Sequence, residues 1–167
     1  MAKRIPHDTD KLREELAFQL RSGHAHANLD EVTEKLPFEL QGKVPKGLPY
    51  SAWQLLEHIR LAQEDMFNFS DNTKGDYEQP DWPDGYWPKS PAPPNNRTWN
   101  KSVRRVRDDR ERFIHIMATR DLFEPFPWGD GQTLFHETCL LLDHNAYHLG
   151  EILTVRRLVG AWPAKKK

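Results

Sequence analysis

The stretch DHNAYHLGE, residues 143–151, sets two histidines four residues apart. It lies in a proline-free segment from about Thr133 to Val159, for which we expect one long helix. On that helix His144 and His148 rise on one face about 6 Å apart, close enough to share a metal ion. The spacing alone is only moderately specific, because the chain has eight histidines.

A metal site needs a third ligand, and His58 is the candidate that the sequence favours. We expect a helix from about Ala52 to Ser70, capped by Ser51. On this helix His58 falls between Leu55 and Ala62, on the side that the apolar residues turn toward the core. His58 should therefore point inward.

The other candidates for a third ligand are weaker. His7 lies in the N-terminal tail, and His115 belongs to a segment dominated by charged residues. Three neutral imidazoles from His58, His144 and His148, at about 2.0–2.1 Å from the ion, suit zinc, nickel or a similar divalent transition metal. Such a site leaves at least one coordination position open.

A competing interpretation is that the three histidines are core side chains satisfied by hydrogen bonds. For any single histidine this is the more common situation. Burying three imidazoles together without a metal or carboxylate partners costs desolvation, and no sequence neighbours compensate all three. We therefore favour one divalent metal ion per chain.

Glu151 shares the helix face of the two histidines, since it follows His144 by seven residues and His148 by three. It could orient a ligand, bind the metal, or act as a general base on a water molecule beside the metal. An ordinary surface carboxylate is an equally good interpretation. We take Glu151 as the candidate catalytic residue. Asp143 and Glu57 adjoin ligands, but helical neighbours diverge by about 100°, so they should point elsewhere.

Three other segments have helical periodicity, and none is convincing as a strand. Residues 8–22 repeat leucine at every fourth position and precede Gly23, which should end the helix. A short helix should begin after Asn28 and stop near Pro37, and a third long helix should begin after Thr98 and run to about residue 119. The sequence therefore predicts an all-α four-helix bundle, formed by a single domain over residues 1–167.

Three further histidines, His24, His26 and His136, receive no role in the metal site. His24 and His26 lie beside the predicted end of the first helix. His24 and His26 could lie in an exposed loop or line the mouth of the site.

The segment of residues 71–97 is dense in proline and aromatic residues, as in WPDGYWP at 82–88. Regular structure is not expected there. Large rings left in water forgo favourable burial, so we expect an ordered loop that Trp82, Tyr86 and Trp87 hold against the bundle.

Composition narrows the function classes. The chain has a net charge of −1, 37% apolar and 29% charged residues, which gives no reason to expect nucleic acid as a partner. The arginines of residues 104–112 alternate with acidic residues, as on a solvated helix face. No segment has the roughly 20 apolar residues that cross a bilayer, and the single Cys139 cannot form an internal disulfide. We expect a cytoplasmic protein without a membrane partner.

Several motifs resemble those of a known family, the damage-inducible DinB-like proteins, which include the YfiT-like metal-dependent enzymes. The resemblance spans nearly the whole chain. The family shares its name with a DNA polymerase of a different fold, and nothing in this sequence suggests polymerase chemistry. Its most specific parts are LLEHI at 55–59, WPDGYWP at 82–88, GDGQT at 129–133, DHNAYHLG at 143–150 and RRLVGAW at 156–162.

The resemblance implies an up-down-down-up four-helix bundle with the Trp/Pro-rich loop between its second and third helices, and homodimers are frequent. It carries a metal-ligand role onto His58, His144 and His148. Some proteins of this fold transfer low-molecular-weight thiols. We therefore expect a metal-dependent enzyme of hydrolase or thiol-transferase type, acting on a small molecule, with a thiol among the candidates. The alternative is a non-catalytic stress-response or binding module that the metal stabilises.

Overall fold

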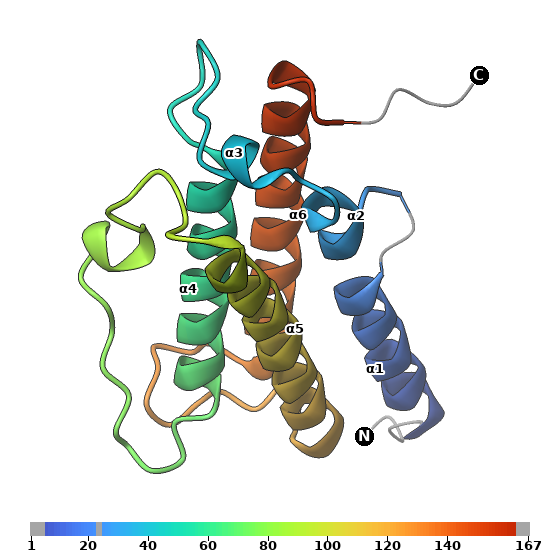
Figure 1. Ribbon diagram of the computed structural model, residues 1–167. Coiled ribbons are helices and arrows are strands. Elements are labelled where there is room, and N and C mark those ends of the chain that lie inside the picture. The colour runs from blue at the N-terminus through green and yellow to red at the C-terminus, as the bar shows by residue number, and fades with distance from the viewer. Residues whose placement is uncertain (1–5, 23–24, 163–167) are drawn as a thin grey trace.

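The computed structural model describes residues 6–22 and 25–162, and within these ranges it contains helices and no named strand (Figure 1). The predicted all-helical fold is confirmed. The helices are α1 (Pro6–Arg21), α2 (Leu29–Thr33), α3 (Phe38–Gln41), α4 (Ala52–Ser70), the 3-10 turn η1 (Asp84–Tyr86), α5 (Asn96–Thr119) and α6 (Leu134–Leu158).

Side-chain caps fix where the site-bearing helices begin. The Ser51 side chain accepts a hydrogen bond from the backbone N–H of Gln54, and the Gln54 side-chain oxygen accepts one from the backbone N–H of Ser51. Thr133 caps α6 by accepting from the N–H of His136. Both helices therefore begin where the sequence predicted. Gly23, the predicted end of the first helix, lies outside the described residues.

Two boundaries differ from the prediction. The helix α5 begins at Asn96 rather than after Thr98, because the Asn95 side chain accepts a hydrogen bond from the backbone N–H of Thr98. The short helix α2 ends at Thr33 rather than near Pro37, because Glu34 takes an extended backbone conformation with ψ of 148° and Lys35 a left-handed one with φ of 54°.

The helix α4 makes its most extensive contacts with α5 and α6, beside which it lies (Figure 1). The helix α6 runs antiparallel to α4, so residues late in α4 face residues early in α6. Apolar side chains of α4, such as Leu55 and Ile59, are almost fully buried between these helices. His58 therefore sits on a rigid, buried element.

Arg156 ties the small helix α2 to the last turns of α6. Its side chain is 3% exposed, and Nη1 donates hydrogen bonds to the carbonyls of Glu31, Val32 and Glu34. Carbonyls at the C-terminal end of a helix lack partners within it, and a guanidinium satisfies several at once. Arg156 thus fixes the end of α6 that follows the candidate site.

The loop between α4 and α5 packs on the site as expected, with one correction. Tyr86 is buried and Trp87 is partly buried, but Trp82 is 76% exposed, so the prediction that Trp82 packs on the bundle is wrong. The reason is that Tyr86 and Trp87 already fill the contact. The Trp82 ring only leans on Tyr86, with the ring centroids 5.5 Å apart.

The charged face of α5 is laced with ion pairs. Arg105 pairs with Glu64 and Asp109, and Arg107 with Asp30. Across the described part of the chain, every helix is too short or too polar to traverse a bilayer. The assignment of residues 1–167 to a single domain stays a prediction.

Candidate metal centre

The structure brings His58 of α4 together with His144 and His148 of α6. One nitrogen from each ring lies within 4.8 Å of the others, and no other group of three or more histidine, cysteine or acidic residues in the described chain converges in this way. The Nε2 atoms of His58 and His144 are 3.1 Å apart. The ring of His148 lies with its centroid 4.5 Å from each of the other two.

The His58 ring is held from two sides. Its Nδ1 lies 2.8 Å from the carbonyl oxygen of Tyr86, to which it donates, so Nε2 is left with its lone pair facing the other histidines. The ring of Trp87 stacks on His58 at 4.0 Å between centroids and 5° between planes. Tyr50 stacks on Trp87 in turn, at 4.1 Å. The loop therefore fixes both the tautomer and the plane of His58.

The two histidines of α6 are held differently. His148 donates from Nδ1 to Oε2 of Glu151 at 2.7 Å, which leaves the lone pair of Nε2 free to bind an ion. Nδ1 of His144 is buried and has no hydrogen-bond partner. A hydrogen bond on the outer nitrogen is the usual support of a metal-bound imidazole. His58 and His148 have that support, and His144 relies on the helix alone.

Burial keeps the three imidazoles uncharged. It lowers the pKa of His144 to about 4, helped by the neighbouring His148 and His58, and it lowers the pKa of His148 to about 4 as well. The pKa of His58 is lowered by the same cause. Neutral imidazole is the form that binds metals, so the site is ready for an ion at neutral pH.

These residues fit a divalent transition metal. Three neutral nitrogens converge, two are fixed by their outer atoms, and nitrogen donors suit zinc, nickel and related ions. The core-histidine interpretation accounts for the contact between His58 and His144 but not for the convergence of a third ring, that of His148, on the same point. It also gives no reason for the lone pairs to face one another.

A cleft of about 520 Å³ opens beside the histidines. Besides the three rings, polar and aromatic side chains line it from α4, from α6, from the loop between α4 and α5, and from the loop before α6. They include Asp65, Phe69, Tyr77, Gln79, Trp82, Tyr86, Gln132 and Glu137. The cleft can hold a small molecule next to the metal centre.

Sequence reasoning missed two acidic residues of this cleft. Asp65 follows His58 by seven residues, and Glu137 precedes His144 by seven, which is two helical turns in each case. That spacing was the available signal. It also missed the carbonyl of Tyr86, for which the sequence carries no signal.

The remaining candidates lie away from the centre. His26, His115 and His136 are exposed, Asp143 is exposed, and Glu57 is engaged by Arg60. The side chains of His7 and His24 lie outside the described residues.

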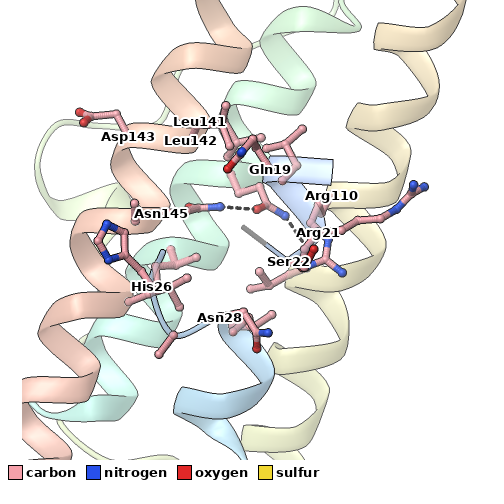
Figure 2. A pocket seen from close by; sticks show the side chains of 18 of the residues that line it. Gln19, Arg21, Ser22, His26, Asn28, Arg110, Leu141, Leu142, Asp143 and Asn145 are labelled. Atoms are coloured by element: carbon pink, nitrogen blue, oxygen red, sulfur yellow. Dashed lines mark hydrogen bonds between the residues drawn. The ribbon is translucent and has the colours of Figure 1, made fainter. Parts of the chain in front are cut away.

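A second cavity, of about 570 Å³, lies between α1, α2, α4, α5 and α6 (Figure 2). Its walls are mainly apolar and include none of the three histidines. On its wall Asn145 donates to Gln63, which donates in turn to the carbonyl of Val106. These amides tie three helices together. The candidate functional site is assigned to the cleft beside His58, His144 and His148 rather than to this second cavity, because the three imidazoles converge there.

Of three comparisons with known proteins, one found a match. No significant match was found among curated proteins or among solved structures. A family model described as the DinB superfamily matches residues 23–152, which span most of the chain and contain all three histidines and Glu151. The chain therefore belongs to the DinB superfamily.

Proposed function

We propose that the protein is a metal-dependent enzyme whose ion is held by His58, His144 and His148. The observation that carries this proposal is the convergence of the three ring nitrogens within 4.8 Å beside an open cleft. The reaction is of the hydrolase or thiol-transferase type, because both need an electrophile or nucleophile activated next to a small-molecule pocket.

A bound divalent ion would supply Lewis acidity at the end of the cleft. The chain's own residues supply position. Tyr86 and Trp87 hold the His58 ring, and Glu151 holds His148 through its Nδ1 hydrogen. The cleft walls then bind the substrate and shield it from water.

Glu151 is proposed as the residue that handles a proton in this reaction. Its side chain is 34% exposed, and burial raises the pKa of its carboxyl, which favours a group that can accept and return a proton. Its hydrogen bond to His148 also supports a positioning role. Substitution of Glu151 separates the two roles: loss of a positioning residue lowers the metal content, whereas loss of a residue that only transfers a proton leaves the metal content unchanged.

The alternative is a non-catalytic module in which the ion only stabilises the fold. Structural sites are closed, whereas three histidines leave room for a further ligand, and the 520 Å³ cleft supports access for one. These features favour the enzyme.

The up-down-down-up topology, the homodimer and a cytoplasmic location belong to the same proposal. The antiparallel course of α4 and α6 supports the topology (Figure 1). Within this proposal, Trp82, an exposed ring of the loop between α4 and α5, is the contact assigned to the dimer.

Cobalt substitution tests the proposal. We expect the Co²⁺-loaded protein to show visible absorption that changes when a simple alkanethiol is added, because a free position accepts the thiolate. His144→Ala should abolish the absorption. A Co²⁺ spectrum that does not change on addition of thiol, azide or other small ligands would mean that the ion has no open coordination position. That result would support the non-catalytic binding module.

A further inference from the structure

Two groups of titratable side chains line the cleft at different heights along the helices. One is the histidine centre, and the other, called the acidic level, consists of Asp65 and Glu137. Asp65 lies seven residues after His58 on α4, and Glu137 lies seven residues before His144 on α6. Because the two helices are antiparallel, both steps lead in the same direction along the cleft. Seven residues of helix rise about 10.5 Å, so an acidic level lies roughly that far from the histidine level.

Glu137 is the unusual member of the acidic level. It lines the cleft and is only 5% exposed, yet its carboxylate has no hydrogen bond or ion pair with any described residue. Burying a carboxylate without a partner is costly. Burial raises the pKa of Glu137, neighbouring His136 opposes that rise, and Asp65 adds to it. A cation bound in the cleft would supply a partner for this carboxylate.

A structural role does not explain this burial. Glu137 lies in the first turn of α6, where an acidic side chain interacts favourably with the helix dipole. An exposed carboxylate at the same turn would give that benefit without the cost of desolvation. The position of Glu137 inside the cleft therefore indicates a ligand.

The groups around Glu137 suit a cationic ligand. Asp65 accepts hydrogen bonds from the hydroxyls of Tyr77 at 2.9 Å and Tyr86 at 2.7 Å, which fix the position of its carboxylate. Burial and this carboxylate raise the pKa of Tyr86 to about 12. Among the described residues, the ring of Phe69 lines the cleft and no lysine or arginine does. Fixed acidic groups beside aromatic rings recognise an ammonium group.

We propose that Glu137 and Asp65 bind a protonated amine of the substrate, while the other end of the same molecule reaches the histidine centre. The substrate is thus a small aminated molecule long enough to span both levels. This inference rests on the proposed function for the end at the histidines only. The acidic level binds an amine whether or not an ion is present.

The first experiment tests the acidic level by itself. Butylammonium and butanol are titrated into the protein, with and without zinc, and binding is followed by backbone amide shifts in NMR spectra. We expect the ammonium to bind about 10- to 100-fold more tightly than the alcohol, the range of a charge-assisted hydrogen bond, and to shift signals near Glu137. Equal binding of the two probes would overturn the proposal.

Matched variants identify the residue responsible. Glu137→Gln keeps the volume and removes the charge, so it should erase the preference for the ammonium. Glu39→Gln removes the same charge from an exposed site on α3 and should keep the preference. A preference that survives Glu137→Gln would also refute the assignment. Two zinc ions per chain, with the second lost in Glu137→Gln, would mean that the acidic level is a metal site instead.

The second experiment joins the two levels. A series of ω-aminoalkanethiols is titrated into the zinc-loaded protein, with the matching hydroxyalkanethiols as controls. We expect affinity to peak at one chain length, and the peak to vanish in Glu137→Gln while zinc content stays unchanged. If ammonium binding holds but the protein takes up no zinc, the proposed function fails and the amine site stands. A flat series on zinc-loaded protein would contradict a spanning substrate.

Discussion

Oε2 of Glu151 lies 2.7 Å from Nδ1 of His148, one helical turn earlier on the same face of α6. The carboxylate therefore holds the ring in the tautomer that leaves Nε2 free. We expect Glu151→Ala to weaken metal affinity about 10- to 100-fold. Competition with a chromogenic chelator measures this, and Glu39→Ala, on an exposed site, serves as the control.

The conservative variant separates positioning from proton transfer. The amide oxygen of Glu151→Gln can still accept from Nδ1, so metal affinity should stay close to that of the wild type. If Glu151 also moves a proton, turnover of an identified substrate should fall about 10²- to 10⁴-fold. Normal metal content with normal turnover would remove Glu151 from the chemistry, and lost metal would make its role one of support.

Trp87 should matter to both stability and metal binding, because it is stacked between Tyr50 and His58. We expect Trp87→Ala to lower the free energy of unfolding by about 2–4 kcal/mol, near the range for large-to-small changes in a core. Metal affinity should also fall, since His58 loses the ring that fixes its plane. Urea denaturation and chelator competition give the two numbers.

The control for Trp87 is Phe38→Ala, which truncates a ring that is 42% exposed. It should change the free energy of unfolding by no more than about 0.5 kcal/mol and leave metal affinity intact. A Trp87→Ala protein as stable as this control would show that the stack contributes nothing.

The metal-free protein should lose stability in acid over a defined range. The pKa of His144 and His148 is about 4 in the folded chain against 6.5 for an unperturbed histidine. Between these values the unfolded state binds more protons, so the free energy of unfolding should fall as the pH drops from about 6.5 to about 4. Below that range these two groups add no further loss.

The contribution of the histidines can be isolated by substitution. In His144→Asn/His148→Asn the pH dependence over this range should be shallower, because two groups with lowered pKa are gone. Urea denaturation at a series of pH values measures it. A slope equal to that of the wild type would mean that these rings are not held neutral.

We expect a homodimer in solution, because the 76% exposure of Trp82 leaves a large ring uncovered in one chain. Light scattering at micromolar concentration should give twice the mass of one chain, and Trp82→Ser should shift the mass toward that of one chain. A wild-type protein that stays monomeric would remove the idea.

Much of this site could be read from the sequence, because helical periodicity fixes which side chains share a face. His144 and His148 follow from their spacing, and His58 follows from its place in an apolar row. The acidic level did not follow. Asp65 and Glu137 meet only because α4 and α6 are antiparallel in one particular register, which is a tertiary property.

The errors have similar causes. Trp82 is exposed because Tyr86 and Trp87 occupy the contact beneath the loop, and no local pattern tells which of three rings is excluded. The predicted start of α5 is too late because Asn95, which caps the helix, directly follows a proline-rich stretch that is typical of a loop.

The most direct test of the central claim is the metal content of purified protein and of single histidine variants. Elemental analysis should find close to one divalent transition metal per wild-type chain. His58→Ala, His144→Ala and His148→Ala should each lose most of it, while His115→Ala, which changes an exposed ring of α5, should retain it. Equal metal content in all five proteins, or none in any of them, would contradict the account.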